Sequence, residues 1–126
     1  MRAKGAVAEN AAICHLCAHG LTLITKNYRS RFGEIDLVMR EGNTLVFVEV
    51  RQRASDAFGD AAQSITPRKQ RRIVATAHVY LANLSVSPPC RFDAVLLSGN
   101  DHLEWIRDAF SAYVNGGVKA SHVAAR

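Results

Sequence analysis

Two carboxylates, Asp36 and Glu49, lie within apolar segments of the sequence, where a charged side chain is costly to bury. The segments 33–40 and 44–51 alternate in character around Gly42-Asn43, a pattern typical of a β-hairpin. A two-residue turn at this point puts Asp36 directly opposite Glu49, with their Cβ atoms about 5 Å apart. Because like charges in such positions repel each other, the hairpin predicts that something offsets the repulsion.

The register of this hairpin follows from one wholly apolar face. That face pairs Met39 with Val46, Leu37 with Val48, and Ile35 with Val50. The other face pairs Val38 with Phe47, Asp36 with Glu49, and Glu34 with Arg51. The two carboxylates therefore share a face with large apolar side chains, and desolvation adds to the cost of ionising them.

Several arrangements would offset the repulsion between the two carboxylates. A divalent cation fits, because Mg²⁺ favours one or two carboxylates together with water and phosphate oxygens. A proton shared by Asp36 and Glu49 would also serve, as would a register slip that separates them. Arg51 could instead neutralise both within a structural salt-bridge cluster. The hairpin alone leaves the metal site and the salt-bridge cluster as competing interpretations.

A third acid, Glu9, is expected on the inner face of a helix over residues 6–19. Glu9, Ala12, Ile13 and Leu16 recur at helical spacing and form one stripe. A glutamate on a helix is usually solvated, so its place on an apolar stripe favours a functional role. Glu9 is therefore a candidate for the same site as the two hairpin acids.

A second helix, expected from Pro67 to about residue 83 with Thr66 as its cap, begins with a cluster of basic side chains. The cluster consists of Arg68, Lys69, Arg71 and Arg72. A helix N-terminus disfavours cations, so the cluster favours a visiting anion such as a phosphate, with a solvated charged face as the alternative. Gln70 lies on the apolar stripe of this helix and is expected to point toward the sheet and the acids.

The remaining segments complete one α/β domain. Further strands are expected over residues 21–28, 91–97 and 102–106, with a loop over residues 54–64. The element order α-β-β-β-α-β-β predicts a mixed β-sheet flanked by helices. The domain is expected to span residues 1–113, and residues 114–126 to form a flexible C-terminal tail.

Composition narrows the classes of function. The 126 residues are 48% apolar and carry a net charge of +5, with most of the excess in residues 64–126. This length suits one domain, and this charge suits a polyanionic partner such as nucleic acid. No apolar run is long enough for a membrane helix, and no signal-peptide core follows the first residues. The three cysteines are an odd number, so a disulfide scaffold is disfavoured and the cytoplasm is the expected location.

Two weaker signals favour structural roles. Cys14 and Cys17 form a C-x-x-C pair inside the first helix, but a zinc site would need a second pair of ligands. They are expected to be small, partly buried helix residues. Asp93 lies in a core strand and is expected to hydrogen-bond to Arg91 or to a helix end.

Motifs in several parts of the chain occur in a fixed order. They are Gly33-Glu34-Ile35-Asp36-Leu37, Leu45-Val46-Phe47-Val48-Glu49-Val50-Arg51, Thr66-Pro67-Arg68-Lys69-Gln70-Arg71-Arg72, Arg91-Phe92-Asp93 and Asp108-Ala109-Phe110. This set, over roughly residues 5–110, resembles the YraN family of uncharacterised bacterial proteins. That family is similar to archaeal Holliday junction resolvases, so the resemblance implies a restriction endonuclease-like fold.

The resemblance also implies a nuclease site. The motif of the related nucleases is an Asp, then Glu-x-Lys, on neighbouring strands, often with a Glu from the first helix. Asp36, Glu49 and Glu9 match these acids and would hold Mg²⁺ or Mn²⁺ beside a scissile phosphate of branched or structured DNA. Lys69 and Gln70 match family positions on the second helix. By the same resemblance, a homodimer would suit a junction-binding protein.

Arg51 departs from the motif, which has lysine at this position. Arginine stays protonated and cannot act as a base, although it can hold a phosphate through two hydrogen bonds. Arg51 therefore fits either a metal-driven nuclease or a degenerate site that binds DNA without cutting it. Lys69 would replace the missing lysine if it reaches the acids.

Overall fold

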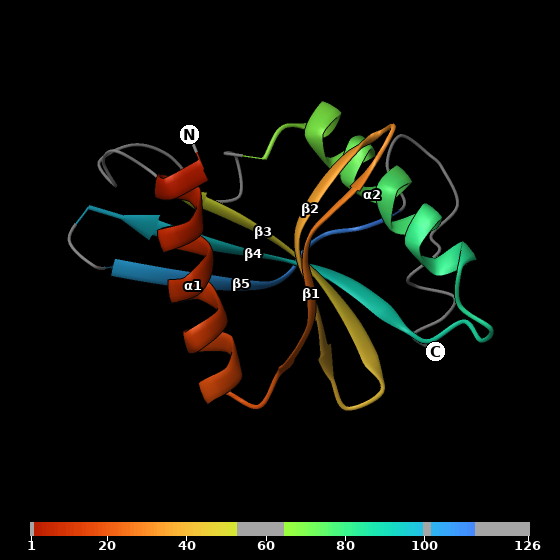
Figure 1. Ribbon diagram of the computed structural model, residues 1–126, viewed down its shortest axis with the longest axis horizontal. Helices are drawn as coiled ribbons and strands as arrows, with labels where there is room; N and C mark the ends of the chain where they lie inside the picture. The colour runs from red at the N-terminus through yellow and green to blue at the C-terminus, as the bar shows by residue number, and fades with distance from the viewer. Residues whose placement is uncertain (1, 53–64, 100–101, 113–126) are drawn as a thin grey trace.

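The computed structural model describes residues 2–52, 65–99 and 102–112 (Figure 1). Within these ranges the elements follow the predicted order. They are α1 (Arg2–Ala18), β1 (Thr22–Ser30), β2 (Gly33–Glu41), β3 (Thr44–Gln52), α2 (Pro67–Ala82), β4 (Cys90–Ser98) and β5 (His102–Phe110). The strands form one sheet in the order β1-β2-β3-β4-β5, in which only the β3–β4 pair is parallel. The predicted α/β class with a mixed sheet is confirmed, and the arrangement is consistent with a restriction endonuclease-like fold.

The parallel step from β3 to β4 requires a crossover connection, which contains α2. The start of α2 is as predicted: the Thr66 hydroxyl accepts a hydrogen bond from the backbone N–H of Lys69 at 3.1 Å, and Pro67 is the first helical residue. The two helices cover opposite faces of the sheet (Figure 1), so the described part of the chain has three layers.

Each face of the sheet has its own apolar core. The core under α2 includes Val38, Phe47, Ile73, Ala77 and Phe92, and the core under α1 includes Ala12, Leu16, Leu37, Val46 and Val48. Burial of a side chain of this kind stabilises the fold by about 1.5–3 kcal/mol. These two cores hold the buried face of each helix against the sheet, and so fix the positions of the elements that carry the candidate acids.

Strand β2 changes face at Asp36. The predicted hairpin register is confirmed from Glu41–Thr44 to Leu37–Val48. Ile35, however, packs in the core under α2, whereas Val50 packs against the core under α1. The prediction that Ile35 faces Val50 on one apolar face is therefore wrong, because strict alternation along β2 ends at Asp36.

The change of face has two visible causes. Asn27, which lies opposite Asp36 between paired positions of β1 and β2, adopts the left-handed conformation with φ 55. On the other side, the Asp36 carboxylate accepts the backbone N–H of Val50 at 2.8 Å. A side-chain oxygen of Asp36 thus takes the place of a backbone carbonyl as the acceptor for Val50. The regular pairing of β2 with β3 ends at Leu37–Val48, so it does not include the predicted pair of Asp36 with Glu49.

Asp93 on β4 is fully buried at the centre of a polar network. Its carboxylate accepts Nε and Nη2 of Arg91 at 2.9 and 3.1 Å, Nε1 of Trp105 at 3.0 Å and the backbone N–H of Asp108 at 2.9 Å. The predicted hydrogen bond between Asp93 and Arg91 is confirmed. Asp108 has φ 53 beside a register shift in the β4–β5 pairing, so this carboxylate holds an irregular part of β5.

Some predictions fall outside the described residues. They are the loop over residues 54–64, the flexible tail over residues 114–126 and the end of the domain at residue 113. Across the ranges that the structure does describe, neither helix combines the length and apolar character needed to cross a membrane.

Candidate active site

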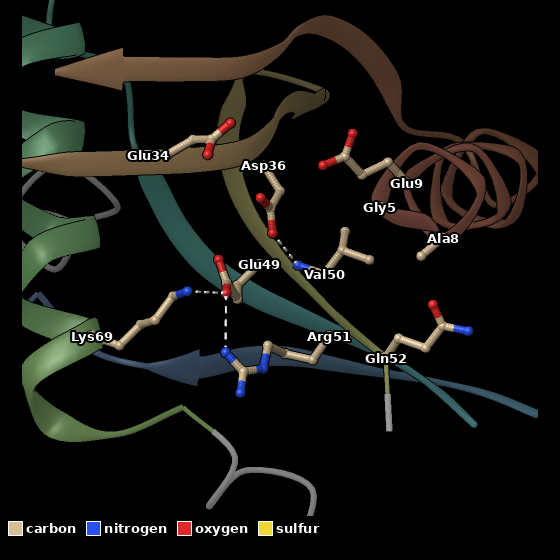
Figure 2. A pocket seen from close by; sticks show the side chains of 10 residues that line it. All are labelled: Gly5, Ala8, Glu9, Glu34, Asp36, Glu49, Val50, Arg51, Gln52 and Lys69. Carbon is tan, nitrogen blue, oxygen red and sulfur yellow. Dashed lines mark hydrogen bonds and ion pairs between the residues drawn. The ribbon is translucent and has the colours of Figure 1, made fainter. Parts of the chain in front are cut away.

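An open cleft of about 470 Å³ lies where α1, β2, β3 and the start of α2 meet (Figure 2). Its charged lining consists of Glu9, Glu34, Asp36, Glu49, Arg51 and Lys69. These residues come from four elements, of which α1 and α2 are distant in sequence from each other and from the β2–β3 hairpin. The fold therefore brings the three predicted acids, Arg51 and one base of the predicted cluster on α2 into one cleft.

Asp36 is the most strongly perturbed carboxyl group in the cleft. Burial, followed by the neighbouring Glu49 carboxylate, raises the pKa of Asp36 from its ordinary 3.8 to about 8. Hydrogen bonding with Glu49 and the charge of Glu9 act in the same direction, while the N–H of Val50 lowers the pKa. In the metal-free protein the carboxyl group therefore keeps its proton at neutral pH, and a cation in this place would take the role of that proton.

Glu49 is buried, with 3% of its side chain exposed, and two cations flank it. Lys69 Nζ lies 3.1 Å from Glu49 Oε2, and Arg51 Nη1 lies 3.8 Å from the same oxygen (Figure 2). Lys69 reaches from α2 across to β3, so the cleft does contain a lysine amine beside its second acid. The position of Lys69 depends on how α2 packs on the sheet, which the sequence does not show.

Glu9 is buried on α1, as its place on the apolar stripe predicts. Its Oε2 accepts a hydrogen bond from Nδ2 of Asn27 at 3.0 Å. In Figure 2 the Glu9 carboxylate extends from α1 toward Asp36. Asn27 is thus a residue of the site that sequence reasoning missed. The available signal was an asparagine inside a strand, where this residue type is uncommon but accepts a left-handed backbone.

Two substitutions separate the contribution of the left-handed backbone at Asn27 to stability from that of its side-chain amide. Asn27→Ala loses the amide and places an ordinary side chain at φ 55, so we expect a loss of about 1–2 kcal/mol in the free energy of unfolding. Asn27→Gly loses the same amide without the backbone strain and is expected to be more stable than the alanine variant. Urea unfolding of both proteins tests this; equal stability of the two variants would contradict it.

Whether these acids suit a divalent metal follows from their arrangement. Within the described residues, no group of three or more His, Cys, Asp or Glu side chains is close enough to hold one ion. Asp36 and Glu49 line the same cleft, and both the charge of Glu49 and a hydrogen bond with it contribute to the raised pKa of Asp36, after burial. Mg²⁺ requires only one or two carboxylates, with water or phosphate oxygens in its other positions, so this pair fits the ion.

The bases predicted at the start of α2 divide between two surfaces. Lys69 lines the acidic cleft, whereas Arg68, Arg71 and Arg72 line a neighbouring hollow. Gln70 donates its amide N–H to the backbone carbonyl of Ile65 at 2.9 Å, which ties down the residue before the helix cap. Among the described residues that line the cleft, Gln70 is not present.

The described ranges thus combine a mixed α/β sheet of restriction endonuclease-like arrangement with a cleft that joins four acids to two bases. The model of the uncharacterised protein family UPF0102 matches residues 8–97, and the chain belongs to this family. This is the YraN family that the sequence motifs indicated, so that prediction is confirmed.

Several relatives match most of the chain. A UPF0102 protein of Nitrosospira multiformis is 58% identical over 112 residues, which cover 87% of this chain and 94% of the relative. One from Nitrosomonas europaea is 60% identical over 109 residues, with 85% and 92% covered. One from Cupriavidus pinatubonensis is 56% identical over 110 residues, with 86% of each chain covered.

Proposed function

We propose that this protein is a metal-dependent endonuclease that cleaves phosphodiester bonds of branched or otherwise structured DNA. The observation that carries the proposal is the meeting of Asp36 and Glu49 in an open cleft with Lys69 and Arg51 beside them. A buried acid whose pKa is raised beside a second carboxylate suits a cation, and the flanking bases suit the phosphate that accompanies it.

Asp36 and Glu49 are the residues that would hold Mg²⁺ or Mn²⁺. The ion, when bound, supplies charge neutralisation at the phosphate and lowers the pKa of a water molecule. Glu9, whose Oε2 accepts a hydrogen bond from the amide of Asn27 at 3.0 Å, would orient that water and accept a proton from it. This role suits a carboxylate that is buried against the cleft but stands apart from the Asp36–Glu49 pair.

Lys69 and Arg51 stabilise negative charge on the phosphate. Both side chains are partly exposed toward the cleft, at 42% and 37%, and both contact Glu49. Arg51 offers two parallel N–H donors to the phosphate oxygens, and Lys69 supplies the ammonium that the motif position of Arg51 lacks. When the acids take up a divalent cation, both bases become available to the DNA.

Lys69→Gln is expected to slow cleavage by about 10²–10³-fold, because it removes a cation beside the reacting phosphate. Arg68→Gln is the matched control: it removes the neighbouring charge, which lies on the other surface of α2. The control is expected to weaken DNA binding while the cleavage rate at saturating DNA is kept. Single-turnover cleavage of both variants checks this, and equal rates would remove Lys69 from the reaction.

A second function is favoured by one specific observation. Lys69 and Arg51 both pair with Glu49 and balance its charge, as expected of a protein that keeps the fold but only binds DNA. In that case Asp36→Ala would leave DNA affinity unchanged or improve it, since it removes a potential negative charge. DNA binding would also weaken steeply with salt, because phosphate contacts release counterions.

The test is a titration of Mg²⁺ and Mn²⁺ against cleavage of a four-way DNA junction, with EDTA as the control. Metal-dependent cleavage supports the endonuclease. No cleavage and no metal binding at millimolar metal, with DNA binding intact, would favour the binding module. We place this activity in the cytoplasm, where a homodimer would match the two-fold symmetry of a junction.

A further inference from the structure

A second hollow, of about 450 Å³, lies beside the candidate active site. It is lined by Arg31, Phe32, Arg68, Arg71, Arg72 and Ala75. Arg31 and Phe32 belong to the turn between β1 and β2, and the other residues belong to α2. Among the described residues of this lining there is no acid, so the hollow differs from the acid-rich cleft and suits an anion.

The turn that carries Arg31 and Phe32 is fixed to α2. Ser30 Oγ lies 2.8 Å from Thr76 Oγ1, and the backbone N–H of Phe32 donates to the same Ser30 oxygen at 3.0 Å. A Cβ atom added at Gly33 would lie 3.3 Å from Cβ of Arg72, so the turn packs closely against the helix. The hollow is therefore built before any ligand arrives.

Phe32 adds a partly exposed aromatic ring to this hollow, which binding of a nucleic-acid phosphate backbone alone would not require. Its side chain is 38% exposed, and the guanidinium of Arg31 lies 4.9 Å from the centre of its ring. An aromatic ring among arginines is the combination on which single-stranded nucleic acids stack their bases. Bases inside a duplex are already stacked on one another, so only an unpaired base can stack on the part of the Phe32 ring that Arg31 leaves exposed.

We propose that this hollow binds an unpaired nucleotide of the DNA substrate, with its base on Phe32 and its phosphates on Arg68, Arg71 and Arg72. The proposal rests on the proposed function and narrows its substrate to duplex DNA that carries a single-stranded extension or branch. Phe32, in the turn before β2, is two residues from Glu34, which lines the cleft, a span of about 7 Å. The unpaired nucleotide therefore lies within a few nucleotides of the bond that is cut.

Binding in EDTA tests this inference without requiring cleavage. The probes are a blunt DNA duplex and the same duplex with a five-nucleotide single-stranded DNA extension, with affinity followed by fluorescence anisotropy. We expect the wild-type protein to prefer the extended duplex by about 5–100-fold, the range that one stacked base supplies. Phe32→Leu, which keeps apolar volume but loses the ring, should remove the preference and leave affinity for the blunt duplex unchanged.

Ile24→Ala provides a matched control, because Ile24 is a similarly exposed apolar side chain, at 39%, on β1. It should keep the preference. A 2-aminopurine at the first unpaired position should lose fluorescence on binding wild-type protein and keep it with Phe32→Leu. Equal binding of blunt and extended duplexes by the wild-type protein, or an unchanged preference in Phe32→Leu, would overturn the inference. At least tenfold tighter binding of an RNA extension would overturn its assignment to DNA. None of these results depends on whether the cleft cuts DNA.

Discussion

Asp36→Asn is expected to abolish metal-dependent cleavage and, at the same time, to stabilise the metal-free protein. The folded protein holds the carboxyl proton of Asp36 up to about pH 8, whereas the unfolded chain releases it near its ordinary value of 3.8. The contribution of Asp36 to the free energy of unfolding is therefore fully present below about pH 4. It is lost as the pH rises toward 8, by up to about 1.4 kcal/mol per pH unit. Asparagine does not ionise, and its side-chain oxygen can still accept the N–H of Val50.

Urea unfolding of the wild type and Asp36→Asn at pH 5, 6.5 and 8, in EDTA, measures this effect. The variant is expected to gain on the order of 2–4 kcal/mol relative to the wild type between pH 5 and pH 8. Mn²⁺ should stabilise only the wild type, because a ligand stabilises the state that binds it. Glu104→Gln removes an exposed carboxylate from β5 and should change stability by less than about 0.5 kcal/mol. A pH-independent difference between the wild type and Asp36→Asn would contradict the account of Asp36.

The second large effect is a loss of stability expected on substitution of Asp93, which is a structural residue and not one of the candidate acids of the cleft. Its buried carboxylate has four donors, two of them from Arg91, and none of its surface is exposed. Asp93→Asn turns an amide group toward these donors and leaves Arg91 with Glu41 as its acidic partner, at 2.7 Å. Because Arg91 keeps this partner, we expect Asp93→Asn to cost about 2–3 kcal/mol in the free energy of unfolding, mainly through weakened hydrogen bonds to a buried charged group.

The loss at Asp93 is measured by urea unfolding at pH 7. Trp105, the single tryptophan, donates its indole N–H to Asp93, so its fluorescence should shift in the same variant. Arg29→Gln is the control: Arg29 forms a pair with Glu34 at 3.6 Å while 66% of its side chain is exposed, and its loss should cost less than about 1 kcal/mol. A similarly small cost at Asp93 would show that the network contributes little.

Local patterns were sufficient to predict much of the framework. The apolar pairs Met39–Val46 and Leu37–Val48 predicted the hairpin register correctly, because a shift by one residue would turn these side chains to the other face. Thr66 and Pro67 marked the start of α2, and helical spacing put Glu9 on the buried side of α1. These features depend on residues that are close in sequence, so the sequence alone was sufficient to predict them.

The finer arrangement of the site depends on contacts between distant elements. The face change at Asp36 requires the left-handed Asn27 on another strand, so alternation within β2 could not reveal it. The reach of Lys69 to Glu49 depends on the packing of α2 against β2 and β1. For the same reason, the basic cluster could be predicted as a unit but not its division between the cleft and the hollow.

The small net charge of the chain therefore conceals two surfaces of opposite character, an acid-rich cleft and a basic hollow. The acids Glu9, Asp36 and Glu49 gather in the cleft, while three arginines of α2 gather in the adjoining hollow. The proposed function would use both surfaces, the cleft for the metal at the bond that is cut and the hollow for the backbone beside it.

The central claim is that Asp36 and Glu49 form a metal site. The most direct measurement is an anomalous difference map from crystals of the wild-type protein soaked in MnCl₂, with Asp36→Asn crystals soaked in parallel. The account predicts a manganese peak between the carboxylates of Asp36 and Glu49 in the wild type, and no peak there in the variant. A wild-type map without a peak at this position, with Lys69 still paired to Glu49, would contradict it.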